Sequence, residues 1–118
     1  MHSDPVHTTH HLYKKVVLTV IKIASEQFEQ RLLAESIATI EKVIPLARYA
    51  LELVDMLNLY RLVATTEYRR KEFQTSLDLC HIIIYMCSSI EELQELRLEM
   101  LKLAALSRMG LREYEEAC

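Results

Sequence analysis

The chain has 118 residues, of which 51% are hydrophobic and 26% are charged, and its formal net charge is −3. This length suits a single domain with a core of its own, and the composition is that of a globular protein. The acidic balance excludes a basic surface for nucleic acid, and no apolar run is long enough to span a membrane, so neither is expected as a partner.

Glycine and proline are scarce, since the sequence holds one glycine and two prolines. Glycine supplies positive φ angles and proline interrupts helices, so few tight turns and long uninterrupted elements are expected. A β-sandwich of this length would need many more turn residues. The sequence therefore predicts an all-α fold.

In chain order, residues 1–8 are predicted to form a flexible tail, and the first helix to start near Thr9, where apolar residues begin to recur with helical period. Pro45 suits the first turn of a helix and not its middle, so one helix is predicted to end near Val43 and the next to begin at Pro45. Residues 9–118 are predicted as one all-α domain, with helices over about 9–25, 29–43, 45–68, 72–86, 89–108 and 111–118.

Two helix-end signals follow in the second half of the chain. The spacing of Ser88 and Glu91, or of Ser89 and Glu92, predicts a capping box that starts a helix. Gly110 predicts the end of that helix in a left-handed cap, with a final helix after it.

The helix predicted over 45–68 carries one narrow polar stripe on an otherwise apolar surface. A helix on the outside of a small bundle has a more even division, so this pattern predicts neighbours on two or three sides. Adjacent helix hairpins of a repeat array would supply such cover, and so would a second copy of the chain. The stripe consists of Arg48, Glu52, Asp55 and Asn58.

A short motif with an aromatic residue after Glu or Gln recurs at Phe28, Phe73 and Tyr114, at separations of 45 and 41 residues. Ser76 and Ala117 place a small residue three positions after the second and third aromatic residues. Over residues 45–118 this pattern resembles the second helices of tetratricopeptide repeats. The spacing departs from that family, whose usual period is about 34 residues.

The resemblance implies antiparallel helical hairpins in a fragment of an α-solenoid; the alternative is a helical bundle, possibly dimeric. It implies a non-enzymatic scaffold that binds a partner protein or peptide in a groove lined by the first helix of each hairpin. Basic residues there would suit an acidic or C-terminal peptide. Carried onto this sequence, the partner-binding positions are Asn58, Arg61, Thr65, Tyr68, Arg69, Glu99 and Lys102.

Two other functions stay open, a helical homo-oligomerisation domain of a larger assembly and a small all-α enzyme. For the enzyme, the only candidates are Cys80 and His81, and adjacent helical residues point about 100° apart. His7, His10 and His11 have helix-compatible spacing but no cysteine nearby. We therefore expect no catalytic residue, metal or cofactor.

The three cysteines have no spacing that indicates a disulfide framework. Cys80 and Cys87 are too far apart along a helix to bridge, so free buried thiols in a reducing compartment are expected. The first residues lack the basic-then-apolar pattern of a signal peptide. Together these features predict a cytoplasmic location.

Overall fold

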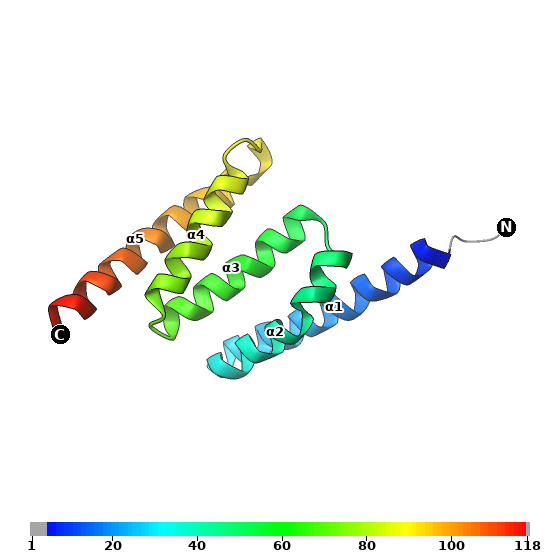
Figure 1. The fold of residues 1–118 in the computed structure, drawn as a ribbon, viewed down its shortest axis with the longest axis horizontal. Helices are drawn as coiled ribbons and strands as arrows, with labels where there is room; N and C mark the ends of the chain where they lie inside the picture. Colours follow the sequence, from blue (N-terminus) through cyan, green and yellow to red (C-terminus); the bar gives the residue numbers. More distant parts are fainter. Residues whose placement is uncertain (1–4, 118) are drawn as a thin grey trace. The chain divides into compact units, whose positions relative to one another are not determined.

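A computed structural model describes residues 5–117, with side chains from residue 9 onward. Within that range the chain is helical and contains no strand, which confirms the predicted all-α class (Figure 1). None of the described helices is both long and apolar enough to cross a bilayer. The elements are α1 (Pro5–Glu29), α2 (Leu33–Ala50), α3 (Leu53–Arg69), α4 (Phe73–Cys87), the 3₁₀ turn η1 (Glu91–Leu93) and α5 (Gln94–Ala117).

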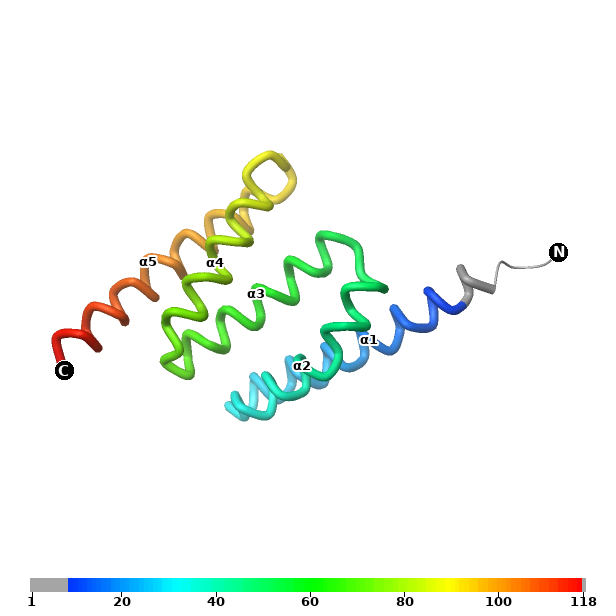
Figure 2. The backbone as a smooth tube through the Cα atoms, in the orientation of Figure 1, coloured from blue at the N-terminus to red at the C-terminus, as the bar shows by residue number. Residues whose placement is uncertain are grey.

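The chain divides into two compact units, Met1–Leu59 and Tyr60–Cys118, where the sequence predicted one domain over residues 9–118. In the first unit α1 and α2 pack against each other as a hairpin. In the second unit α4 packs against α5, and the last part of α3 precedes α4. Figure 2 traces the backbone through both turns.

The α1–α2 hairpin is closed by a left-handed residue, Arg31, with φ of 63°. The backbone N–H of Arg31 bonds to the carbonyl of Phe28, and that of Leu32 bonds to the carbonyl of Gln27. This is the Schellman arrangement, which satisfies carbonyl groups at the end of α1. A basic residue stands where glycine is usual, at the negative end of the helix dipole.

Small buried residues let α1 and α2 approach closely. The Ser36 hydroxyl donates a hydrogen bond of 2.8 Å to the backbone carbonyl of Ala24 on the facing helix. Both residues are fully buried. Apolar side chains of α2, among them Ile37, Ile40 and Val43, bury beside them and form the core of this unit.

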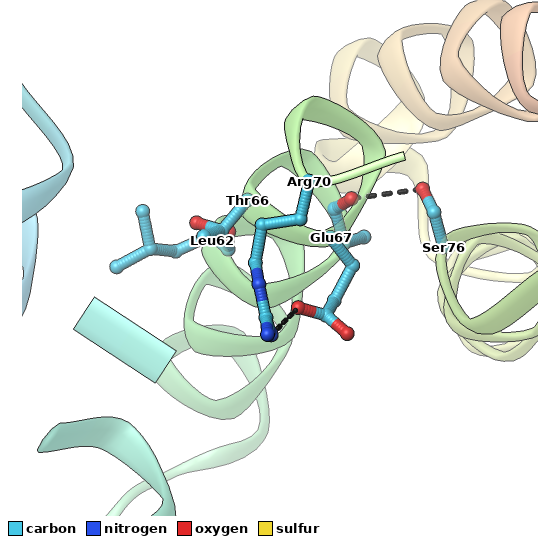
Figure 3. Close-up of polar contacts among 6 residues, drawn as sticks. Leu62, Thr66, Glu67, Arg70 and Ser76 are labelled. Atoms are coloured by element: carbon cyan, nitrogen blue, oxygen red, sulfur yellow. Dashed lines mark hydrogen bonds and ion pairs between the residues drawn. The ribbon is translucent and has the colours of Figure 1, made fainter. Parts of the chain in front are cut away.

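The α3–α4 turn has the same geometry 40 residues further along the chain. Lys71 has φ of 65°, and its N–H bonds to the carbonyl of Tyr68. The Ser76 hydroxyl donates to the carbonyl of Ala64 at 2.8 Å. Figure 3 shows this bond together with the nearby Arg70–Glu67 ion pair.

Helix α5 packs on the buried side of α4. The Ser107 hydroxyl donates to the Ser76 hydroxyl at 3.2 Å, so two buried serines join the two helices. One turn later, Gly110 lies against the Phe73 ring, where an added Cβ would come within 2.6 Å of the ring atoms. The only glycine therefore allows a close helix approach.

Several predicted boundaries in the first half were wrong. Helix α1 begins at Pro5 and continues to Glu29, and residues 1–4 of the expected tail lie outside the described residues. Pro45 lies inside α2. Pro45 and Glu41 are both exposed, so water can satisfy the Glu41 carbonyl that lacks a proline N–H. The helix ends instead at Leu51, which is extended with ψ of 145°.

The predicted helix ends in the second half were also wrong. The Ser88 hydroxyl donates to the Tyr85 carbonyl behind it and forms no capping box. The Gln94 side chain instead bonds to the carbonyls of Cys87 and Ile90 in this turn. Gly110 does not close a helix, because α5 continues through it to Ala117 and no glycine has positive φ.

Candidate partner-binding groove

A groove of about 230 Å³ lies between α3 and α5 in the second unit. One wall comes from α3 and the rest from successive turns of α5. The α5 positions recur at three- and four-residue steps, which places them on one side of that helix. The lining residues are Thr65, Glu99, Met100, Lys102, Leu103 and Leu106.

The floor of the groove is apolar. Met100 and Leu103 are buried beneath it, and Leu106 stands at its side with a partly exposed side chain. Burial of an apolar surface in such a depression is favourable by roughly 25 cal/mol per Å². A methionine in the floor also adapts its shape to different side chains. The floor can therefore accept one apolar side chain of a ligand.

Charged groups border this floor. Arg61 on α3 pairs with Glu99 on α5, with 3.1 Å between Nη1 and Oε2. Both side chains are largely exposed, and exposed ion pairs contribute little, about 0–1 kcal/mol. Arg61 can thus exchange Glu99 for a ligand carboxylate at small cost. Lys102 adds a second cation at the rim.

The sequence-predicted binding residues fall into two groups. Thr65, Glu99 and Lys102 line the groove, and Arg61 joins them through its ion pair with Glu99. The remaining three residues do not line it. Tyr68 lies against the Phe73 ring at 5.7 Å between centroids, Arg69 is exposed at the end of α3, and Asn58 is exposed in the first unit.

Sequence reasoning missed the apolar members of the groove. Met100, Leu103 and Leu106 follow each other at three-residue steps on α5. This periodicity was visible in the sequence, but it indicates only that one helix face is apolar. Whether that face is filled by the chain or left open depends on the position of α3.

The residues considered for catalysis are not arranged as a pair. The Cys80 side chain is buried, and desolvation raises the pKa of its thiol, which lowers its nucleophilicity. His81 is exposed, and its Nε2 lies 2.9 Å from Arg108 on α5. Among the described residues, no group of three His, Cys, Asp or Glu side chains could hold a metal ion. His10 packs edge-on against Tyr49.

Comparison with family models, with curated proteins and with solved structures finds no match for this chain. The resemblance to tetratricopeptide repeats therefore stays a prediction from the sequence. Function is inferred below from the geometry of the chain itself.

Proposed function

We propose that the chain is a non-enzymatic helical-repeat module that binds a peptide segment of a partner protein in the α3–α5 groove. The observation that carries this proposal is the combination of an apolar floor at Met100 and Leu103 with a charged rim at Arg61, Glu99 and Lys102. Concave apolar surfaces with a few placed polar groups are typical of ligand sites.

The recurrence of hairpin geometry supports the repeat part of the proposal. Arg31 and Lys71 have the same left-handed conformation 40 residues apart. Ser36 and Ser76, also 40 residues apart, make the same hydrogen bond across their hairpins. Arrays of this kind use the surfaces of successive hairpins to bind extended partners.

The chemistry of the groove selects the ligand. An apolar side chain would enter over Met100 and Leu103, and a carboxylate next to it would be held by Lys102. Arg61 would exchange its partner Glu99 for the same carboxylate. The expected ligand is therefore a peptide with an acidic group, at a side chain or at its C-terminus, beside an apolar residue.

A peptide display selection on the purified chain tests this proposal, followed by affinity measurement on the enriched peptides by fluorescence anisotropy. We expect enrichment of acidic–apolar pairs. Lys102→Glu should weaken binding roughly tenfold or more, since it replaces an attractive charge with a repulsive one. Lys42→Glu is the matched control, because Lys42 is an exposed lysine on α2, away from the groove.

Two outcomes would contradict the proposal. One is the absence of any enriched sequence class at high peptide concentration. The other is equal affinity of the enriched peptides for the Lys102→Glu and Lys42→Glu variants, which would place their site elsewhere.

We also propose that the module works in a reducing compartment such as the cytoplasm. Cys80 and Cys87 are free and buried, as thiols that serve only in packing would be.

A further inference from the structure

One face of α1 is apolar and uncovered. Leu12, Val16 and Ile23 are exposed along it, and Val20 between them is half-buried. The four residues, here called the α1 stripe, follow each other at steps of four, four and three, so they share one side of the helix. None of them is charged.

The same helix positions are covered in α5. Residues 80 positions after Val16, Val20 and Ile23 are Leu96, Met100 and Leu103, and all three are buried. Helix α5 buries this side through its packing with α4. A face that packs in the second unit is therefore left open on α1.

A second uncovered apolar face lies on α5. Leu98, Leu101 and Met109 are exposed large side chains, and Ala105 between them is also exposed. These four residues, here called the α5 stripe, lie on a different side of α5 from the residues buried against α4. None of them lines the peptide groove.

The two stripes match in length. Val16, Val20 and Ile23 span the same seven-residue distance as Leu98, Leu101 and Ala105. Two helices that run in the same direction can place these sets side by side, with the small Ala105 beside the larger Ile23. Apolar faces of this kind associate through ridges and grooves of side chains.

Charges decide which faces pair. Lys15 and Lys22 lie along one edge of the α1 stripe, and Glu95 and Glu99 lie along one edge of the α5 stripe. In the parallel arrangement these edges meet, and Lys15 falls between the two glutamates. Pairing α1 with another α1 in the antiparallel sense would bring lysine edges together, which costs free energy.

We propose that a second copy of the chain docks head-to-tail, with its α1 stripe on the α5 stripe of the first copy. Such an interface is heterologous, because each copy uses two different surfaces. Each added copy leaves a free α1 stripe at one end and a free α5 stripe at the other. Assembly therefore continues beyond a dimer.

Two variants with one blocked surface each test the proposal by sedimentation velocity, from micromolar to millimolar concentration. The wild-type mass should rise with concentration without stopping at a dimer. Val16→Lys blocks one surface and Leu98→Glu the other, so each alone should stay monomeric, with affinity weakened roughly tenfold or more. An equimolar mixture retains one intact interface and should form dimers and nothing larger.

Ile82 on α4 supplies the matched control. It is 52% exposed, against 51% for Val16 and 55% for Leu98, and it lies on neither stripe. Ile82→Lys and Ile82→Glu should assemble like the wild type. Circular dichroism checks that each variant folds. Lys15→Glu is the milder test: it should weaken assembly, and adding Glu95→Lys in the same chain should restore it.

Three results would overturn the proposal. The first is a wild-type chain that stays monomeric at every concentration. The second is a mixture of the two blocked variants that stays monomeric. The third is a Leu98→Glu variant that still dimerises, which would show that α1 pairs with itself. None of these results bears on the peptide groove, whose test uses other residues.

Discussion

The two hairpins α1–α2 and α3–α4 share a turn and differ in what surrounds it. In each, a basic residue takes the left-handed position, and a buried serine bonds to an alanine carbonyl on the facing helix. In the second hairpin the serine also accepts a hydrogen bond from Ser107 on α5. The close-contact positions are thus conserved in kind between the hairpins, while the contacts around them change.

Large side chains at equivalent positions differ more freely. Leu33 and Phe73 occupy the same place at the start of α2 and α4, and Gln27 and Glu67 occupy the same place in the preceding helices. Gln27 accepts a hydrogen bond from Thr39, whereas Glu67 pairs with Arg70. A small residue at a helix contact sets the helix separation, and large residues can exchange when their surroundings adjust.

The largest expected effect comes from emptying the core of one hairpin. Ile40→Ala in the first unit and Ile83→Ala in the second each remove a fully buried side chain. Each should lower the free energy of unfolding by about 2–5 kcal/mol, measured by urea denaturation. If the two units are separate in stability as well as in contacts, amide exchange should accelerate mainly in the unit that carries the substitution.

Equal acceleration throughout 5–117 by either variant would contradict this expectation, because it would make the whole chain one cooperative unit. Ile82→Ala is the control for the second unit. Ile82 is next to Ile83 in sequence but half exposed, so its truncation should cost far less.

The serine contact gives a smaller effect that should differ between the hairpins. Ser36→Ala removes one hydrogen bond and should cost about 0.5–1.5 kcal/mol. Ser76→Ala also deprives the buried Ser107 hydroxyl of its acceptor and should cost about 1–3 kcal/mol. Alanine's helix propensity offsets both costs alike. Denaturation of the Ser76→Ala/Ser107→Ala pair is the check, because losing both hydroxyls should cost less than the two single changes added together.

The fold class followed from the sequence, because scarce glycine and proline leave few turn residues. The helix boundaries followed less well, since local signals were overridden by packing. Pro45 promised a boundary but lies inside α2, on an exposed side where its missing N–H is tolerated. The true boundary at Leu51 has neither glycine nor proline, and nothing local marks it.

The register of the hairpins was also hidden. Phe28 and Phe73 look equivalent in sequence, but Phe28 precedes the first turn and Phe73 follows the second. The structural counterpart of Phe73 is Leu33, 40 residues earlier. Small residues carry the register more reliably here, because Ala24 and Ala64 are fixed by contact distance while aromatic residues are not. The groove depended on knowing that α5 continues unbroken past α3.

The next effect concerns Gly110, which has no counterpart contact in the first hairpin. Gly110→Ala would place a Cβ 2.6 Å from Phe73 ring atoms. Overpacking costs about 1–3 kcal/mol, and alanine returns about 1 kcal/mol of helix propensity, so a net loss near 1 kcal/mol is expected. In a Phe73→Leu background the same change should become neutral or stabilising. Stabilisation by Gly110→Ala in the wild-type chain would show that the ring moves aside freely.

The smallest effect tests the feature that the hairpins share most closely, the left-handed residue of the turn. A Cβ in this conformation costs roughly 1–2 kcal/mol, and the greater unfolded-state freedom of glycine costs about 0.5–1 kcal/mol. Glycine should therefore be more stable than alanine by about 0.5–1 kcal/mol at Arg31 and equally at Lys71, since their φ angles are 63° and 65°. Comparing glycine with alanine at each site removes the effect of the lost charge.

At an ordinary helical position the order should reverse. Lys42 on α2 is exposed and helical, so glycine there should be less stable than alanine by about 1 kcal/mol. Urea denaturation of the six variants measures all three differences. If the turns at Arg31 and Lys71 gave different values, the two hairpins would be alike in backbone geometry but not in the strain that their surroundings impose, and the equivalence on which the 40-residue register rests would extend only to the buried serine contact.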